Sequence, residues 1–460
     1  MNKLLIHYFT TLILLLCSQA LTAQYHMPEE IAQHEGTWLQ WPHNYTYGAP
    51  WKADHEAAWI EMTRALVTGE NVHIVAYNAA EMTAIQQALT AANVPLTNID
   101  FHIYPTDDYW VRDNGPIYVY DNQNNLYITD WGFNGWGNDA TYTLCDVIPD
   151  SVSQNTGVPR LDVNAVVLEG GSIEIDGNGS MMATRSSITG TDRNPGLTEA
   201  QIESYMTQYL GITNFLWLDG VAGLEITDMH IDGFMKFHDS TTIVCMDSLD
   251  LVDVGVPAHD ITSLFSATNV NGNAYNYVII PATANNVVTT AGQNLGYKGS
   301  YANYYIANSV VLVPNYNDPN DAVANGILQN LYPNRTVVGI DCRNAYANGG
   351  MVHCVTQQQP VNLNTTSIEK ATPLTIKMSQ NFPNPSSNQT TIHLAISQTA
   401  NVALMITNMT GATVQTVLAG RLGAGSHQIS IATKNLAPGL YNYTLIQDNQ
   451  NKITKTMIVK

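Results

Sequence analysis

One recurrent pattern constrains the fold of residues 24–360 more than any other feature of this sequence. A polar residue near glycine precedes an alternating run typical of a strand, and a polar turn follows. Helical patterns lie between these runs, as in 197–211 and 322–333. Five such units predict an α/β fold whose equivalent positions converge on one axis. The pattern occurs in RDNGPIYVYDNQNN (112–125), EGGSIEIDGNGS (169–180), HIDGFMKFHDST (230–241), NYYIANSVVLVPNYND (303–318) and GGMVHCVTQQQ (349–359).

Each repeat carries a polar or reactive side chain at a comparable place. If the repeats are cyclic, these side chains meet at one end of a central cavity, although each comes from a different unit. The marked positions are Asp113, Glu169, His230 with Asp232 two residues later, Asn303 and Cys354.

Length and charge narrow the class of protein. A chain of 460 residues exceeds one ordinary core, so we expect more than one domain or one large repeat fold. A formal net charge of −20 with only 18 Lys and Arg argues against a nucleic-acid partner. An acidic surface favours cationic substrates, although solubility alone also explains it.

The first residues, MNKLLIHYFTTLILLLCSQALTAQ, have the pattern of an export signal. Lys3 provides a positive start, the run 4–16 is apolar, and Ala20 or Ala23 precedes a cleavage site that the sequence does not fix. We assign 1–23 to a signal peptide whose apolar run is too short to span a membrane. The mature chain is expected to be exported and to contain no transmembrane segment.

The residue composition and pattern of the chain change near residue 361. Residues 361–378 are Thr-rich and weakly patterned, like a linker, and 379–460 alternate short β-branched runs with turns, which predicts a small β-sandwich. Three segments, NFPNP (381–385), LAPGLYNYTL (436–445) and the final KITKTMIVK, resemble the C-terminal sorting domain of type IX secretion. The resemblance implies that the secretion machinery is a partner and that the protein is secreted or attached to the cell surface. An appended adhesion module is the alternative.

Four cysteines remain after the signal peptide, too few for a disulfide scaffold in so long a chain. One disulfide among Cys145, Cys245 and Cys342 is left open. Cys354 is a candidate for packing, metal ligation or nucleophilic attack. We expect no metal, because His230 and Asp232 have no second histidine at ligand spacing, and His238 and His259 are candidates only by default.

A cysteine and a histidine from distant repeats favour covalent catalysis, in which a thiolate attacks and an imidazole moves protons. His353 is adjacent to Cys354, but neighbouring side chains on a strand point to opposite faces, so His230 is the better partner. Asp113, Glu169 and Asp232 would make the pocket anionic. Such a pocket suits a guanidinium, which carboxylates hold in bidentate fashion. The combination indicates attack on a guanidine or amidine carbon.

At these residues the sequence resembles the agmatine deiminase and Porphyromonas-type peptidylarginine deiminase family, part of the guanidine-modifying superfamily. The resemblance implies the pentein fold, a five-fold pseudosymmetric α/β propeller. It spans nearly all of 24–360 and rests on 27–42, DDYWVRDNGP (107–116), FNGWG (133–137), 168–179, TDMHIDGFMKF (227–237), YANYYIAN (301–308) and GGMVHCVTQQ (349–358).

The resemblance also implies roles for the marked residues. Cys354 would be the nucleophile and His230 the general acid and base, with a thiouronium intermediate that water resolves to a ureido product. Asp113 and Asp232 would hold the guanidinium, Glu169 would support the site, and no metal or organic cofactor is required. Asn303 corresponds to a polar site residue, and Trp110 either flanks the substrate or packs. Met229 stands where the family usually has Gly, and Asn348 and Met351 interrupt its glycine run.

The sequence favours agmatine as the substrate and N-carbamoylputrescine as the product. Glu225 and Asp228 precede His230 and could hold the distal amine, and the segment 131–138 resembles agmatine deiminases and lacks Arg. The alternative is a secreted peptidylarginine deiminase that makes peptidyl-citrulline, which needs a cation for a carboxylate; Arg160, Arg185 and Arg193 are the candidates. A non-catalytic adhesin or scaffold is the alternative from another class. The oligomeric state is open.

Overall fold

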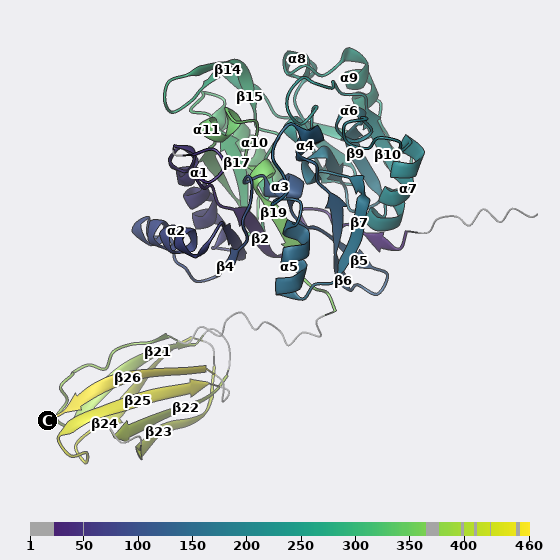
Figure 1. Cartoon of the computed structure of the whole chain (residues 1–460). Helices are drawn as coiled ribbons and strands as arrows, with labels where there is room; N and C mark the ends of the chain where they lie inside the picture. The colour runs from purple at the N-terminus through teal and green to yellow at the C-terminus, as the bar shows by residue number, and fades with distance from the viewer. Residues whose placement is uncertain are drawn as a thin grey trace, which may run out of the picture. The chain divides into compact units, whose positions relative to one another are not determined.

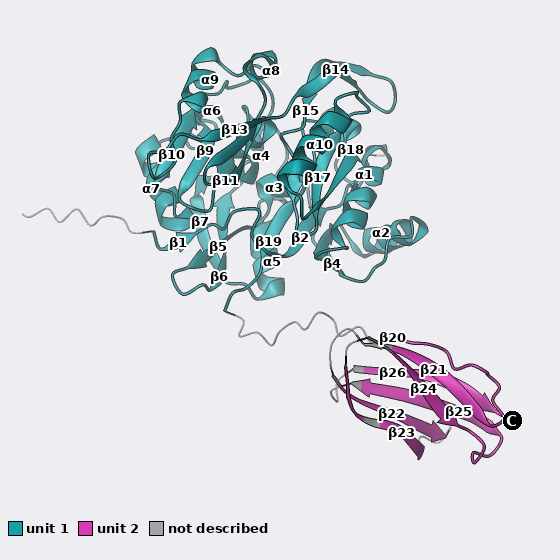
Figure 2. Cartoon of the chain, turned by 180° about the vertical axis from the view of Figure 1, so that it is seen from behind, with its two compact units in different colours: residues 1–364 teal, residues 365–460 magenta. Residues whose placement is uncertain are grey.

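The computed structural model describes residues 23–48, 50–364, 377–396, 400–408, 412–423, 425–447 and 451–460. The chain divides into two compact units, 1–364 and 365–460, coloured separately in Figure 2. The predicted signal peptide, except residue 23, and most of the predicted linker lie outside the described residues, so both stay predictions.

The described residues of unit 1 form five sheets of three or four strands, visible with their helices in Figure 1. The first two sheets hold β1 (Tyr25–His26), β5 (Ile117–Asp121), β6 (Leu126–Gly132) and β7 (Arg160–Val167), and β8 (Ile173–Ile175), β9 (Ser180–Thr184) and β10 (Asn214–Leu218). The next two hold β11 (Met235–Asp239), β12 (Thr242–Cys245) and β13 (Asn276–Ile279), and β16 (Tyr305–Ile306), β17 (Val310–Asn315) and β18 (Thr336–Asp341). The fifth holds β2 (His34–Gln40), β3 (Asn71–Ala76), β4 (Ile99–Ile103) and β19 (Gln357–Pro360).

One pairing scheme recurs in all five sheets. The strand that follows each marked polar segment pairs antiparallel with a second strand, and that second strand pairs parallel with a third. Thus β11–β12–β13, β16–β17–β18 and β19–β2–β3 have the same order and directions as β5–β6–β7 and β8–β9–β10. β14 (Ala282–Val288) and β15 (Asn294–Ser300) form a separate hairpin. The five repeats recognised in the sequence therefore correspond to five similar sheets.

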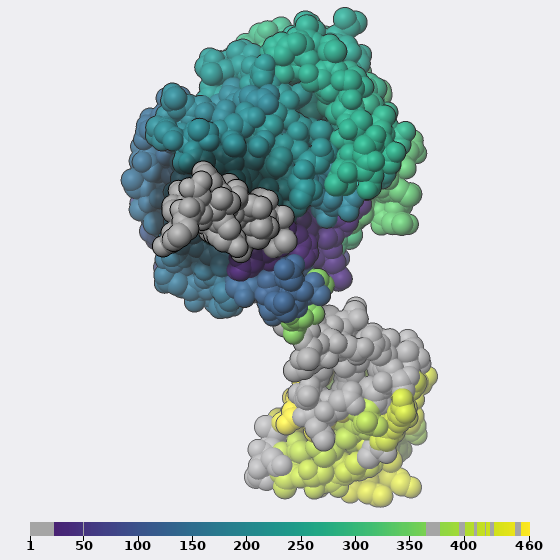
Figure 3. Space-filling model, turned by 90° about the vertical axis from the view of Figure 1, so that its right-hand side faces the viewer, coloured from purple at the N-terminus to yellow at the C-terminus, as the bar shows by residue number. Residues whose placement is uncertain are grey.

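The last strand of unit 1 returns to its first segment. β19 pairs with β2, so Gln357 lies opposite Trp38. Figure 1 labels β19 and β2 next to each other, and Figure 3 shows purple atoms of the early residues of unit 1 at the surface. This pairing brings Cys354, close to the end of the unit, into contact with residues from earlier repeats.

Helices connect the sheets, and the two predicted from periodicity are confirmed as α7 (Glu199–Leu210) and α10 (Asp321–Leu331). A capping box between Thr198 and Gln201 begins α7, and Gly211 ends it in the left-handed conformation. The other helices are α1 (Trp51–Leu66), α2 (Ala79–Ala91), α3 (Val111–Asn114), α4 (Gly135–Asn138), α5 (Ile148–Thr156), α6 (Arg185–Ile188), α8 (Ser248–Asp253), α9 (Ala258–Phe265) and α11 (Arg343–Tyr346).

The marked polar residues lie in short turns just before the strands rather than on the strands. Three such turns are 3₁₀ helices: η1 (Gly170–Ser172), η2 (Ile231–Gly233) and η3 (His353–Val355). His230 and Asp232, two residues apart, therefore do not lie on a strand, because the chain makes η2 before pairing begins at Met235. Alternation of faces holds only for extended backbone.

Unit 2 is all-β and has its own core. Its antiparallel sheets are β20–β21–β24 and β23–β22–β25–β26. Ile392, Leu404, Ile406, Tyr443 and Met457 are completely buried in one hydrophobic cluster. The strands are β20 (Lys377–Met378), β21 (Gln389–Ile396), β22 (Ala400–Asn408), β23 (Thr413–Leu422), β24 (Gly425–Ala432), β25 (Gly439–Gln447) and β26 (Asn451–Val459). In the described part of the chain, no helix has the length and apolar character needed to cross a membrane.

Candidate active site

Cys354 lies in η3, directly before β19, and its thiol faces polar groups from two other repeats. Its Sγ is 3.3 Å from Asn303 Nδ2 and 3.7 Å from Asp232 Oδ2. Burial, together with the charges of Asp232 and Asp113, raises the pKa of the thiol well above its usual range. Without a cation nearby, Cys354 is therefore a protonated thiol.

The other three cysteines of the described chain differ from Cys354 in their surroundings. Cys145, Cys245 and Cys342 are buried and free, so the disulfide that the sequence left open does not form. Burial raises the pKa of Cys245 to about 12. None of the three lines the cavity described below, which leaves Cys354 as the thiol at the site.

His230 is held between two carboxylates. Its Nε2 lies 2.8 Å from Glu169 Oε2, and its Nδ1 lies 3.6 Å from Asp113 Oδ1. Burial alone would lower the pKa of this imidazole, but Asp113 and Glu169 outweigh burial and raise the pKa to about 9. His230 is consequently an imidazolium at neutral pH and can donate a proton.

Asp113 is fixed by backbone and side-chain donors. Its Oδ1 accepts from the Gly171 N–H at 3.0 Å, and its Oδ2 accepts from Trp136 Nε1 at 3.0 Å. Burial raises the pKa of Asp113 to about 6, with Glu169 adding to the rise and His230 opposing it. Any Cβ at position 171 would lie 2.7 Å from both Asp113 Oδ1 and His230 Nδ1, which explains the glycine.

Asp232 is the second carboxylate beside Cys354. Burial would raise its pKa, but the hydrogen bond and charge of His353 hold the pKa below its usual value, because the Nδ1–Oδ2 distance is only 2.7 Å. The main chain of Asp232 also accepts from Asn303 Nδ2 at 3.1 Å. Asp232 and Asn303 therefore form a connected pair around the thiol.

Glu169 and Asp228 share a buried guanidinium. Arg193 is completely buried at its side chain; its Nε donates to Glu169 Oε1 at 2.8 Å and its Nη1 donates to Asp228 Oδ2 at 2.7 Å. Because these carboxylates occupy Arg193, it has no free donor face for a substrate carboxylate. Arg193 instead holds Glu169, and through it His230.

Replacing Arg193 with Met is expected to destabilise the protein by about 3–5 kcal/mol, because two buried carboxylates would lose their shared cation. Equilibrium denaturation in urea measures this change. Arg185→Met is the matched control: its partners Glu199 and Asp219 are partly exposed, so a loss of about 0–1 kcal/mol is expected. Equal losses in the two variants would contradict the assignment.

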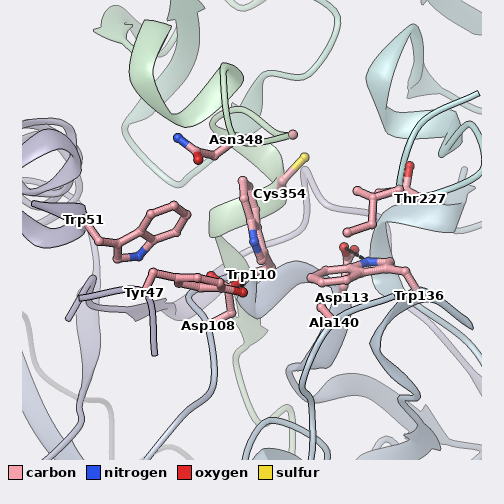
Figure 4. Close-up of a pocket in the computed structure, with 12 residues that line it drawn as sticks. Tyr47, Trp51, Asp108, Trp110, Asp113, Trp136, Ala140, Thr227, Asn348 and Cys354 are labelled. Carbon is pink, nitrogen blue, oxygen red and sulfur yellow. Dashed lines mark hydrogen bonds between the residues drawn. The ribbon is translucent and has the colours of Figure 1, made fainter. Parts of the chain in front are cut away.

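A cavity of about 210 Å³ opens beside Cys354, Asp113 and Trp110 (Figure 4). This volume is below the roughly 300–1,000 Å³ typical of drug-sized sites and suits a small substrate. His230, Asp232 and Asn303 do not line the cavity, but they contact Asp113 or Cys354, which do. The lining residues are Tyr47, Trp51, Asp108, Trp110, Asp113, Trp136, Ala140, Ile226, Thr227, Asn348, Gly349 and Cys354.

One wall of the cavity carries a carboxylate that sequence reasoning missed. Asp108 accepts from the Tyr47 hydroxyl at 2.7 Å and from the Tyr109 N–H at 2.8 Å, and burial raises its pKa to about 6. Trp51 lies beside Tyr47 in this wall (Figure 4). The signal was present in DDYWVRD, where Asp108 precedes Trp110 by two residues.

The glycines before Cys354 permit close packing. An added Cβ at Gly350 would lie 2.3 Å from the Trp110 ring, and Gly349 has φ +110°. Trp110 therefore both packs against the turn of the nucleophile and lines the cavity. On the opposite side, Trp136 from the segment 131–138 points its indole N–H toward Asp113 (Figure 4).

Glu225 and Asp228 do not line the cavity. The Glu225 side chain accepts from Thr227 N at 2.8 Å and from Met229 N at 2.7 Å, so it shapes the loop that brings Ile226 and Thr227 to the cavity. Met229 has φ +73°, a conformation that glycine adopts without strain, which explains the glycine expected at this position.

The remaining arginine candidates also lie elsewhere. Arg160 pairs with Asp130 and Asp150, and Arg185 pairs with Glu199 and Asp219. No Lys or Arg occurs among the described residues that line the cavity. His259, a metal candidate only by default, pairs with the exposed Asp219 near Asp260, and none of these residues lines the cavity.

Comparisons with known proteins agree over nearly all of unit 1. Residues 26–360 match the family of Porphyromonas-type peptidyl-arginine deiminases. A Streptomyces coelicolor protein named as a candidate agmatine deiminase is 34% identical over 349 residues, which cover 73% of this chain and 99% of that one. An agmatine deiminase from Pseudomonas aeruginosa is 28% identical over 360 residues, covering 73% and 95% of the two chains.

Solved structures show the same similarity. The agmatine deiminase of Enterococcus faecalis superposes with a TM-score of 0.65 at 25% identity, covering 74% of this chain and 97% of that one. Residues 380–460 match the secretion system C-terminal sorting domain, which indicates export to a secreted or surface location. This chain therefore belongs to the Porphyromonas-type peptidyl-arginine deiminase family of amidine hydrolases and carries a secretion sorting domain.

Proposed function

We propose that this chain is an exported deiminase that hydrolyses the guanidinium of agmatine to N-carbamoylputrescine and ammonia. One observation carries the proposal: Cys354 Sγ lies among Asn303, Asp232 and Asp113 at a small cavity whose charged lining residues are carboxylates. A site of this charge favours a cation and disfavours the oxyanion of ordinary acyl transfer.

Substrate binding prepares the nucleophile. Asp113 and Asp232 hold the guanidinium through paired N–H donors, which places its positive charge beside the thiol. Burial and the charges of Asp232 and Asp113 raise the pKa of Cys354 in the free protein. A bound cation offsets the two carboxylates and favours the thiolate, whose proton passes to solvent because His230 is already protonated. The thiolate then attacks the central carbon, and a C–S bond forms.

His230 moves the protons of both half-reactions. The imidazolium donates a proton to the departing nitrogen, the C–N bond breaks, and ammonia leaves a thiouronium adduct on Cys354. Neutral His230 then takes a proton from water, and the resulting hydroxide adds to the same carbon. The C–S bond breaks as the added hydroxyl passes its proton to the departing sulfur, which gives the ureido product and restores the Cys354 thiol and the His230 imidazolium. Glu169, fixed by Arg193, orients the imidazole throughout.

The finer architecture is part of the same proposal. We place the five sheets of 24–360 around one pseudo-five-fold axis, as a propeller, which their repeated pairing scheme supports. Residues 361–378 are the linker, and the two sheets of 379–460 pack as a β-sandwich that the type IX machinery recognises.

Agmatine is favoured over a peptidyl arginine by the far wall of the cavity. Asp108 offers a carboxylate to a distal ammonium, and Tyr47 and Trp51 flank it. A substrate ending in a carboxylate would meet Asp108 and no lining cation. In this proposal Asp108 takes the amine-binding role that the sequence suggested for Glu225 and Asp228.

The purified protein is expected to release ammonia and a ureido product from agmatine, and to act much more slowly on free arginine or a peptide ending in arginine. The physical reason is repulsion between their carboxylate and Asp108, which costs several kcal/mol across a site. Colorimetric ureido assays with each substrate measure this order. Preference for the peptide would overturn the choice of agmatine but keep the deiminase chemistry.

Asp108→Asn supplies the matched control within this assay. The substitution keeps a side chain of the same size beside Tyr47 but removes its charge. KM for agmatine should therefore rise, while KM for alkylguanidines with a neutral tail should stay constant. No turnover of any guanidine by the wild-type protein would favour the non-catalytic scaffold instead.

A further inference from the structure

His353, the residue before the nucleophile, contacts the site through a carboxylate. The sequence placed it on the face opposite Cys354, as on a strand, but η3 turns its imidazole into the protein interior, where it is 2% exposed. Its Nδ1 lies 2.7 Å from Asp232 Oδ2 and its Nε2 lies 2.7 Å from Glu30 Oε2. The ring thus bridges two buried carboxylates.

The Asp232 oxygen that contacts His353 is also the one that faces the nucleophile. Oδ2 of Asp232 is 3.7 Å from Cys354 Sγ. The His353 backbone N–H donates to Asn303 Oδ1 at 2.9 Å, and Asn303 Nδ2 is 3.3 Å from the same sulfur. His353 therefore touches neither thiol nor cavity, but it contacts both groups that surround the thiol.

Several further charges face His353 from neighbouring elements. Lys236 Nζ, from β11, is 3.0 Å from Nε2, 3.1 Å from Glu30 Oε2 and 2.8 Å from Glu174 Oε1. Arg112 in α3 donates to the His353 carbonyl at 3.3 Å and lies 3.6 Å from Glu30. Glu174 Oε1 is 3.9 Å from Nε2. The Tyr305 ring, 6.5 Å away, is the aromatic neighbour.

The balance of these charges depends on His353. Three carboxylates, Glu30, Glu174 and Asp232, face two permanent cations, Arg112 and Lys236. Burial raises the pKa of Glu174, and Lys236 and His353 oppose that rise. With all three carboxylates ionised, the buried group has one negative charge in excess. A second proton on His353 makes three charges of each sign. Buried charges are stable only when they are paired, so electroneutrality favours the imidazolium.

The contact distances also favour two ring protons. Each nitrogen lies 2.7 Å from a carboxylate oxygen, and an unprotonated nitrogen at that distance would oppose one lone pair to another. Lys236 Nζ, 3.0 Å from His353 Nε2, is then a neighbour of like charge. Glu30 Oε2 offsets the repulsion between them because it contacts both cations.

We propose that His353 is a positioning residue of the reaction: as an imidazolium it ties Asp232 to Glu30 and holds the Asp232 carboxylate as an anion beside Cys354. The inference rests on the proposed function, because Asp232 is there assigned to the guanidinium. Without the charge on His353, Asp232 would take up a proton more readily and grip the cation less firmly.

His353→Gln tests the role, since the amide keeps a donor but cannot carry charge. For agmatine we expect kcat/KM to fall by about 10²-fold near neutral pH. The acidic limb of its pH profile should shift to higher pH and become steeper, because Asp232 would then titrate together with Asp113. Raising the pH should therefore restore part of the lost activity. A parallel, uniformly lowered profile would show a merely structural role and overturn the proposal.

His73→Gln is the matched control. His73 is also a buried imidazole on a carboxylate, with Nε2 2.8 Å from Glu35 Oε2, but it does not line the cavity or contact Asp232. Its variant should keep the wild-type shape of the pH profile. If His73→Gln shifted the pH profile as much as His353→Gln, then losing any buried pair of a histidine and a carboxylate would alter the profile. That result would also overturn the proposal.

A second measurement does not depend on turnover. ¹⁵N NMR of histidine-labelled full-length protein at pH 7, with the signal assigned by its loss in His353→Gln, should show both ring nitrogens of His353 protonated. One unprotonated nitrogen would overturn the proposal. If the wild-type protein turned over no guanidine, the proposed function would fail, and this spectrum alone would decide the state of His353.

Discussion

Replacement of Cys354 with Ala is expected to remove turnover of agmatine, with a loss of at least about 10⁴-fold in kcat. The reason is that no other nucleophile at the cavity can form the covalent adduct: Asp113 and Asp108 are engaged by hydrogen bonds, and the other cysteines lie in cores. The fold should survive, because Cys354 is less buried than the other cysteines. Ammonia release measures the effect.

Cys245→Ala provides the comparison for this loss. Cys245 is completely buried in the cluster around β11 and β12, and it does not line the cavity. We expect its removal to lower stability by roughly the cost of a small cavity while kcat stays near wild type. Residual turnover of the Cys354→Ala protein near the wild-type rate would eliminate the nucleophile from the mechanism.

Replacement of His230 with Asn is expected to lower kcat by about 10²–10⁴-fold, the usual contribution of a general acid and base. In the wild-type protein the pKa of about 9 keeps His230 protonated at neutral pH, so kcat/KM should decline as the pH rises through about 9. The variant should lack that decline. The pH profiles of both proteins, measured with agmatine, check the assignment.

The raised pKa of His230 also makes the stability of the fold depend on pH. Because the folded-state pKa exceeds the ordinary value of 6.5, the contacts of His230 with Glu169 and Asp113 stabilise the fold fully below pH 6.5. That stabilisation is lost as the pH rises through about 9. His259 is an exposed histidine paired with Asp219. Its replacement with Asn should leave the decline of kcat/KM and the loss of stability near pH 9 unchanged. A retained decline near pH 9 in His230→Asn would assign that limb to another group.

The sequence predicted the repeats and the meeting of Asp113, Glu169, His230, Asp232 and Cys354 because each has one obvious place in a repeated unit. Their convergence was expected from a cyclic arrangement of the repeats, without knowledge of any distance. Asp108 was not identified from the sequence, although it lies in the DDYWVRD motif two residues before Trp110. The sequence could not predict Tyr47 as a cavity residue, because Tyr47 lies in an irregular segment before α1 that has no counterpart in the repeats.

The structure corrects the sequence analysis at two further residues, His353 and Arg193. His353 was assigned an orientation from strand alternation, but a 3₁₀ turn changes the direction of its side chain. Arg193 was one of three arginine candidates for a substrate carboxylate, whereas the fold buries it between Glu169 and Asp228. In both cases pairing partners from distant repeats decide the outcome, and periodicity does not identify partners.

The most direct measurement is peptide mapping by mass spectrometry of protein quenched with acid during turnover of agmatine. The account predicts an adduct of agmatine less one ammonia on the peptide that contains Cys354, present in the wild-type protein and absent from Cys354→Ala. Ammonia and ureido product should form in equal amounts in the same sample. An adduct on another residue, or equal turnover by the Cys354→Ala protein, would contradict the account.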